Sequence, residues 1–169
     1  YKGHITIKPD FSVEVTGISD EKVEESVYTQ MRDIVTHRKR SSFDNSHGKN
    51  SFSLGDADDT GAMEILVTGD AMGSNYKIRG REICQVKRVM GRMAFVINTH
   101  ESINTGSGYV ASRYDAVFRN PETNEILREV QFEDNYEKIG DYYLMTDQVV
   151  RSREKGQETT TEFNFSNVK

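Results

Sequence analysis

The chain is poor in the residues that build covalent or metal-held scaffolds. It contains one cysteine, two prolines and no tryptophan among 169 residues. A single thiol, Cys84, excludes both an internal disulfide and a zinc site made of cysteines. No apolar run approaches the roughly 20 residues that a transmembrane helix requires. We therefore expect a soluble domain in a reducing compartment.

Apolar residues and positive charge are also scarce. Apolar residues make up 35 % of the chain, against roughly 45–50 % in typical globular domains. Asp and Glu together number 27 and Lys and Arg 22, which gives a net charge of −5. This balance argues against nucleic-acid binding, which depends on clustered basic residues. A sheet that covers only one of its faces needs few apolar residues, and this is how we interpret the composition.

The length fits one domain, and we predict a single domain over residues 1–169. Strand-like sequence begins at once, at Tyr1 rather than at a methionine. We therefore expect a fragment that lacks the native N-terminal segment.

The first 40 residues predict a hairpin and one helix. Residues 1–8 and 11–17 alternate apolar and polar side chains on either side of the turn Pro9-Asp10, which is typical of a β-hairpin. Residues 19–40 have helical spacing, with Ser19 as the expected N-cap and acidic residues in the first turn. The apolar stripe of this helix comprises Val23, Val27, Met31, Ile34 and Val35.

The sequence after Phe43 predicts β-structure only. Alternating segments are separated by short turns about every 10–14 residues, a spacing that favours an antiparallel meander over β–α–β units. The expected strands are 51–54, 62–68, 75–79, 81–90, 92–100, 109–119, 125–133, 141–153 and 158–168. The predicted fold class is α+β and mainly β: a long curved antiparallel meander sheet, or half-barrel, with the amphipathic helix packed on its concave face.

Several segments resemble a known family. They are Phe11-Ser-Val-Glu-Val-Thr-Gly, Met31-Arg-Asp-Ile-Val-Thr-His-Arg-Lys-Arg, Gly69-Asp-Ala-Met-Gly-Ser-Asn-Tyr-Lys-Ile-Arg-Gly, Arg88-Val-Met-Gly-Arg-Met-Ala-Phe, Ser112-Arg-Tyr-Asp-Ala-Val-Phe-Arg-Asn-Pro and Tyr136-Glu-Lys-Ile-Gly. They resemble the uncharacterised DUF3386 family of cyanobacterial and plastid type. The resemblance implies a cytoplasmic or plastid stromal setting and supplies no catalytic motif.

The order of elements is also similar to the half-barrel of lipoprotein-carrier proteins. In those proteins a curved sheet and a helix can enclose an acyl chain, so the resemblance implies a comparable layout. A shared layout does not by itself fix a function.

One loop imitates a calcium site. Residues 56–61 place oxygen ligands at the first, third and fifth positions and glycine at the sixth. The bidentate glutamate expected at the twelfth position is replaced by Val67. We expect a solvated hairpin turn, and we predict no metal site and no cofactor.

Individual polar residues give weaker signals. His100 falls at the end of an expected strand, where a catalytic or ligand-binding role competes with that of a polar strand terminus. Cys84, in a strand beside Ile83, is interpreted as a small buried apolar residue. Basic residues cluster at 37–40 and along 79–92; binding of a membrane surface or a phosphate is one interpretation, and we favour a helix end and a solvated strand face. No catalytic residue is predicted, and His100 is the candidate polar site.

Three functions remain compatible with these patterns. The first is a non-enzymatic domain that binds an apolar or amphipathic ligand, such as a hydrophobic small molecule or lipid, between sheet and helix. Its expected ligand-binding residues are Val27, Met31, Ile34, Phe95, Ile97, Phe132, Phe163 and Phe165. The second is a protein-interaction or assembly factor in a photosynthetic cell. Its expected contact residues are Arg113, Tyr114, Tyr136, Tyr142 and Tyr143. The third is an enzyme of unknown class.

Overall fold

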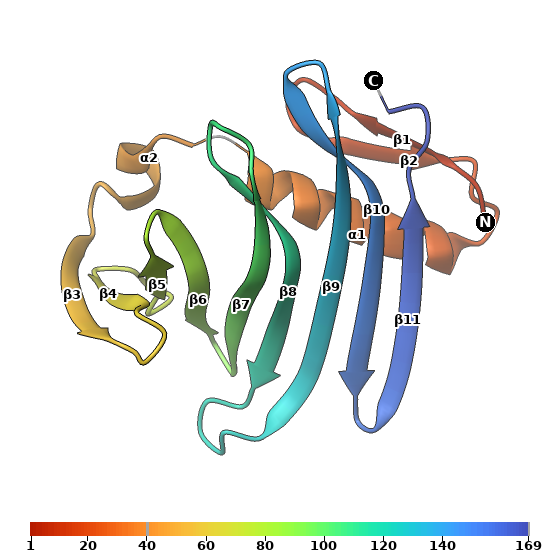
Figure 1. Cartoon of the computed structure of the whole chain (residues 1–169). Helices are drawn as coiled ribbons and strands as arrows, with labels where there is room; N and C mark the ends of the chain where they lie inside the picture. The colour runs from red at the N-terminus through yellow and green to blue at the C-terminus, as the bar shows by residue number, and fades with distance from the viewer. Residues whose placement is uncertain (40, 169) are drawn as a thin grey trace. The chain divides into compact units, whose positions relative to one another are not determined.

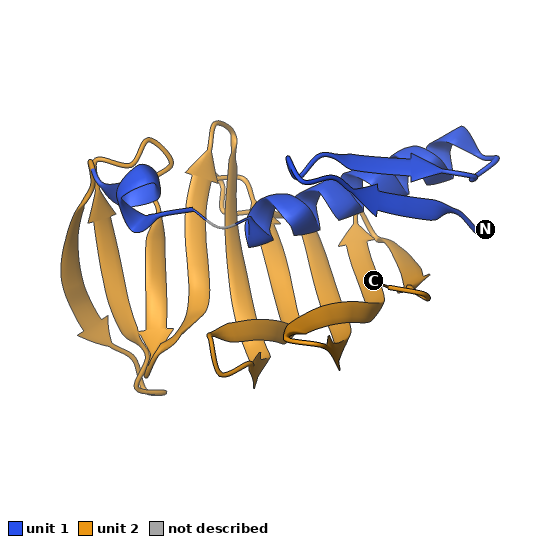
Figure 2. Cartoon of the chain, turned by 90° about the horizontal axis from the view of Figure 1, so that it is seen from above, with its two compact units in different colours: residues 1–48 blue, residues 49–169 orange. Residues whose placement is uncertain are grey.

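The computed structural model describes residues 1–39 and 41–168. The chain divides into two compact units, residues 1–48 and residues 49–169, coloured separately in Figure 2. The single domain expected from the length stays a prediction.

Unit 1 begins with the predicted hairpin. Strands β1 (His4–Ile7) and β2 (Val13–Thr16) pair in antiparallel fashion. Ile5 lies opposite Val15 and Ile7 opposite Val13, so the apolar residues share one face as their alternation predicted.

The main helix, α1 (Glu21–Arg38), begins two residues later than the sequence suggested. Asp20 is its N-cap, and the carboxylate accepts hydrogen bonds from the backbone N–H groups of Lys22 at 3.0 Å and Val23 at 3.2 Å. The prediction of Ser19 as N-cap was therefore wrong. The expected last residue, Arg40, lies outside the described residues. Met31 and Val35 of the apolar stripe are buried.

A second helix was not predicted. Helix α2 (Phe43–His47) occupies a segment that we expected to lead directly into strands. The Ser42 hydroxyl caps it by accepting from Asn45 N–H at 3.2 Å. Within the described part of the chain, no helix is long and apolar enough to cross a membrane.

Unit 2 is a nine-stranded antiparallel meander in which every strand pairs with its sequence neighbour, in the order β3 to β11 (Figure 1). The strands are β3 (Ser51–Ala57), β4 (Met63–Thr68), β5 (Asn75–Arg79), β6 (Glu82–Met90), β7 (Met93–Asn104), β8 (Tyr109–Arg119), β9 (Ile126–Ile139), β10 (Tyr142–Glu154) and β11 (Gln157–Asn164). The sheet is curved, and among the described residues it does not close, so β3 and β11 form its edges. The predicted curved meander is confirmed.

Several strand ends differ from the expected positions. β7 continues beyond His100 to Asn104, and β9 continues beyond Glu133 to Ile139. β11 ends at Asn164, four residues before the expected end. The register shifts between Thr99 and Glu101, and such bulges bend a strand without ending it. Hairpin loops of two residues, such as Gly140-Asp141 with Gly140 at φ 61°, keep successive long strands adjacent.

The two faces of the sheet differ in chemistry. Residues directly opposite one another on paired strands share a face, and alternate residues along a strand share a face. We call one side the apolar face; it includes Ile65, Tyr76, Val86, Phe95, Ile97, Tyr114, Ala116, Phe118, Val130, Phe132, Val150 and Phe163. The other side, the polar face, includes Glu64, Lys77, Gln85, Asn98, Asp115, Gln131, Glu133 and Arg151. The one-sided sheet explains how a chain with so few apolar residues forms a core.

Candidate functional site

The apolar face contains most of the strand residues that we expected to bind a ligand. Phe95 and Ile97 lie on β7, Phe132 on β9 and Phe163 on β11, and the register places all four on this face. Phe165 follows the end of β11 and stacks on Phe163, with ring centroids 6.2 Å apart. The shared face agrees with their alternation, and their role in ligand binding stays a prediction.

Part of the apolar face is open to solvent. Six large side chains from β3, β4, β6 and β7 are each at least a third exposed, and we call them the exposed apolar patch. They are Phe52 (42 %), Leu54 (67 %), Met63 (36 %), Ile83 (54 %), Met90 (51 %) and Met93 (37 %). On the polar face, the large apolar residues of comparable exposure among the described residues of β3 to β7 are Leu66 and Val89 alone. Isolated exposed apolar residues are ordinary, whereas a large contiguous apolar patch is typical of an interaction surface.

A buried polar cluster interrupts the apolar face at β8 to β10. Asp134 is 3 % exposed and Gln148, opposite it, is fully buried. Asp134 Oδ1 accepts from Gln148 Nε2 at 2.9 Å, and Asp134 Oδ2 accepts from the hydroxyl of Tyr136 at 3.0 Å. Tyr114 Oη lies 3.4 Å from the same oxygen. Hydrogen bonds of this kind make a buried carboxylate tolerable and fix the strands that supply them.

A second polar residue on the apolar face is Arg88. Arg88 lies on β6 directly opposite Phe95, whose other neighbour across the sheet, on β8, is Phe118. Arg88 Nη2 donates to Tyr76 Oη at 3.3 Å. The Nε atom is buried and has no hydrogen-bond partner among the described residues. A cationic group with an unsatisfied donor thus lies beside the exposed apolar patch.

His100 lies on the polar face and meets a carboxylate. Its Nε2 contacts Asp115 Oδ2 on β8, and Asp115 Oδ1 accepts from Asn98 at 2.8 Å. Gln85 on β6 donates in turn to Asn98 Oδ1 at 2.9 Å. This chain of bonds orients the imidazole, as a general base requires. The expectation that His100 ends a strand was wrong, because the bulge beside it lets β7 continue.

The calcium-like segment forms the loop of the β3–β4 hairpin, as expected. Asp58 Oδ1 accepts from the backbone N–H of Thr60 at 2.9 Å and from its hydroxyl at 2.6 Å. Asp58 Oδ2 forms an ion pair with Lys77 on β5 at 2.7 Å. The Lys77 ammonium and then the Thr60 hydroxyl hold the pKa of Asp58 well below its ordinary value. The carboxylate therefore fastens the turn to the sheet.

Other residues singled out from the sequence have structural surroundings. Cys84 is half-buried at a bulge in the β5–β6 pairing, and its Sγ lies 3.4 Å from the carbonyl oxygen of Lys77. In the first basic cluster, Lys39 lies over the ring of Phe11, 5.1 Å from its centroid. The second cluster was expected on a solvated strand face. That interpretation was wrong for Arg88, which alternation places on the apolar face while Lys87 occupies the polar face.

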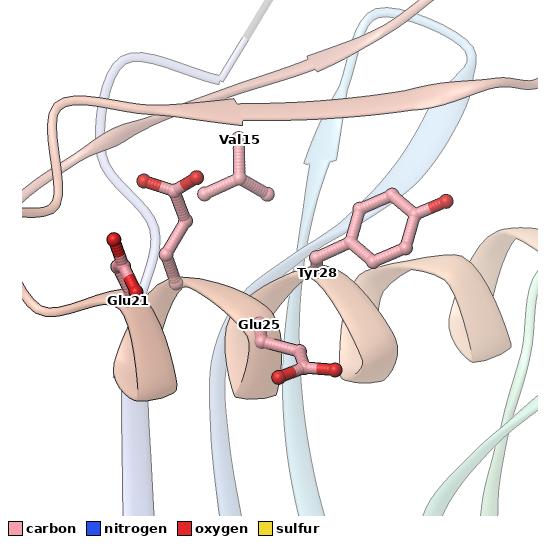
Figure 3. A pocket seen from close by; sticks show the side chains of 5 residues that line it. Val15, Glu21, Glu25 and Tyr28 are labelled. Atoms are coloured by element: carbon pink, nitrogen blue, oxygen red, sulfur yellow. The ribbon is translucent and has the colours of Figure 1, made fainter.

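Unit 1 contains a hollow of about 280 Å³ between β2 and α1. Figure 3 shows Val15 on β2 facing the helix, from which Glu21, Glu25 and Tyr28 project. With Glu24, three carboxylates line this hollow beside Val15 and Tyr28. None of the residues expected to bind a ligand lines it. Val27, Met31 and Ile34 belong to α1, and their role stays a prediction.

No three His, Cys, Asp or Glu side chains within residues 1–39 and 41–168 gather closely enough to hold a metal ion. Two polar residues of the apolar face, Arg88 and Asp134, were missed as site residues. Their signal is present in the sequence, because each occupies a position where the period-2 pattern calls for an apolar side chain.

Comparison with known proteins gives one match. The family model described as a protein of unknown function (DUF3386) matches residues 1–169. No curated protein and no solved structure matches the chain. Because the match covers the whole sequence that folds into the hairpin, the helices and the open meander, the chain belongs to the DUF3386 family.

Proposed function

We propose that this protein is a non-enzymatic binding domain that holds an amphipathic ligand, with its apolar part on the apolar face of the sheet. The observation that carries the proposal is the exposed apolar patch. Leu54, Ile83 and Met90 are each more than half exposed on the same face. Apolar area left in water is unfavourable by roughly 25 cal/mol for each Å². A ligand that covers it therefore gains binding energy.

The occupant that we favour is a flexible hydrocarbon chain. The patch extends from the edge strand β3 to β7, and Met90 and Met93 contribute adaptable thioether side chains that suit a chain of variable conformation. The expected contribution of the helix residues Val27, Met31 and Ile34 belongs to the same proposal. The cytoplasmic or plastid stromal setting that the family resemblance implies is also part of this proposal.

The proposal is tested by calorimetric titration with a series of alkanoates, kept below their micelle concentrations. Each buried methylene contributes roughly 0.8 kcal/mol. Decanoate should therefore bind about fifteenfold more tightly than octanoate, whose chain is two methylenes shorter. Equal affinity for the two chains, or no binding of either, would refute the proposal.

A matched pair of variants locates the site. Met90 and Val89 are neighbouring exposed apolar residues of β6, but only Met90 lies on the apolar face. Met90→Thr should weaken decanoate binding several-fold, whereas Val89→Thr should leave it unchanged. Equal effects of the two substitutions would show that the ligand does not use the apolar face.

The protein-interaction function has less support in the structure. Tyr114 and Tyr136 direct their hydroxyls to buried Asp134, and Arg113 forms an ion pair with Glu101 at 2.7 Å. Tyr142 is 72 % exposed in the β9–β10 hairpin and remains the best contact candidate. Native mass spectrometry of protein purified from its source cell distinguishes the two functions. A copurifying small amphiphile supports our proposal, and a stoichiometric protein partner without one supports the alternative.

A further inference from the structure

The strand register assembles three polar groups at one point of the apolar face. Asn75 pairs with Lys87, so extending the register by one residue places Ser74 opposite Arg88. The bond from Val89 N–H to the carbonyl of Met72 at 2.8 Å shows that the two segments stay adjacent there. Tyr76, the next residue on this side of β5, already accepts a bond from Arg88.

Two of these groups have unused hydrogen-bonding capacity. Arg88 Nε is buried without a partner among the described residues. Ser74 is 3 % exposed, and its hydroxyl makes no hydrogen bond of ordinary geometry in the described chain, although it lies near enough to Asp70 to lower the pKa of that carboxyl. Buried donors are almost always satisfied, so unsatisfied ones in a native protein need an explanation.

Within the described residues, the charge of Arg88 is not neutralised in a direct ion pair, although it helps to lower the pKa of nearby Asp70. None of the ion pairs among the described residues involves Arg88. The nearby Asp70 is engaged elsewhere, because its oxygens accept from the backbone N–H groups of Met72 at 2.9 Å and Ser74 at 3.3 Å. Among the described residues, the hydrogen-bond partner of the guanidinium is the hydroxyl of Tyr76.

We propose that Arg88, with Ser74 and Tyr76, binds the anionic oxyacid head group of the amphipathic ligand whose chain covers the exposed apolar patch. This inference rests on the proposed function and adds the chemical class of the ligand, a long-chain carboxylate or phosphate. A guanidinium presents a planar set of donors that matches the oxygens of either head group. Met90 and Met93 lie one step further along the same face, where the chain leaves the head group.

The test separates head from tail by titrating decanoate, decyl phosphate, decan-1-ol, acetate and inorganic phosphate. Arg88→Gln should weaken decanoate and decyl phosphate binding by about tenfold or more, because it removes a charge-assisted hydrogen bond. Binding of decan-1-ol should not change. The control Arg81→Gln removes the same charge from the exposed β5–β6 turn, and it should change no affinity by more than about twofold.

The outcomes distinguish the possible failures. If Arg88→Gln weakens decanoate and decan-1-ol equally, or weakens neither, the head-group site is refuted while the proposed function stands. If acetate or inorganic phosphate binds as tightly as the long-chain ligands, the site takes a free anion and the amphiphile assignment is wrong. If none of the ligands binds, the proposed function fails and this inference fails with it.

A measurement on the unaltered protein covers the case in which Arg88→Gln does not fold. The Nε–H resonance of Arg88 can be observed in ¹⁵N-labelled protein because the group is buried. Decanoate should shift this resonance strongly and decan-1-ol should not. If the Arg88 Nε–H resonance does not shift at saturating decanoate, Arg88 does not bind the head group.

Discussion

Replacing Arg88 by methionine should stabilise the ligand-free protein. The substitution removes a buried donor that has no partner among the described residues, and such a donor costs roughly 1–3 kcal/mol. It also removes the bond to Tyr76, which at 3.3 Å is long and is worth about 0.5 kcal/mol, the low end of the usual range. Methionine retains most of the aliphatic contact with Phe95 across the strand pair. The expected net gain in the free energy of unfolding is about 1–2 kcal/mol.

Urea denaturation followed by circular dichroism measures this change. A gain of this size corresponds to a rise in Tm of about 2–8 °C for a chain of this length. Arg81→Met, an exposed substitution of the same type, should stay within about 0.5 kcal/mol of the wild type. At the same decanoate concentration, the wild type should gain more stability than Arg88→Met. If Arg88→Met instead loses more than about 1 kcal/mol, the guanidinium is a satisfied structural group and the reasoning is wrong.

Three further substitutions test other parts of the structure. Gln148→Leu removes a buried hydrogen bond to the Asp134 carboxylate and should lower the free energy of unfolding by about 1–3 kcal/mol in urea denaturation. The exposed Gln131→Leu should change it very little, and equal effects would show that the buried cluster does not stabilise the sheet. Asp58 has a lowered pKa in the folded state, so its contribution to stability is present at neutral pH and is lost as the pH falls below about 4. Asp58→Asn should therefore have a lower free energy of unfolding than the wild type at pH 7, and this free energy should fall less on acidification. A fall as large as that of the wild type would contradict this. Asp20→Ala should lower the free energy of unfolding by about 1 kcal/mol because it removes the α1 cap, whereas Ser19→Ala should leave it unchanged. A larger effect of Ser19→Ala would identify Ser19 as the cap.

Alternation of side chains was sufficient to predict the hairpin, the meander and the division of the sheet into two faces. The reason is that each strand pairs with its sequence neighbour, so local turns determine the whole topology. Phe95, Ile97, Phe132 and Phe163 share a face because the period-2 pattern continues through the interiors of the long strands. Features that depend only on local sequence could therefore be predicted.

Features that depend on contacts between residues far apart in the sequence could not be predicted in this way. Asp134-Asn135 has the composition of a turn, yet β9 continues through it because Gln148 and Tyr136 satisfy the carboxylate. The partner of His100, Asp115, is set by a register that includes a bulge. Helix α2 has a single turn and no apolar periodicity, so only its Ser42 cap marks it.

The polar residues of the apolar face show most clearly where pattern analysis fails. Arg88 occupies a position between Val86 and Met90 where alternation calls for an apolar residue. Grouping it with neighbouring basic residues concealed this exception. A charged residue at an apolar position is unfavourable to folding unless it is paired, and it is therefore a sign of function or of a buried network.

The most direct test of the proposed function is NMR of the six methionine methyl groups during titration with decanoate. Met90 and Met93 belong to the exposed apolar patch, whereas Met145 lies on β10, three strands along the sheet from β7. We expect large shifts at Met90 and Met93 and little change at Met145. If saturating decanoate leaves Met90 and Met93 unshifted, the proposed binding of a hydrocarbon chain on the apolar face is wrong.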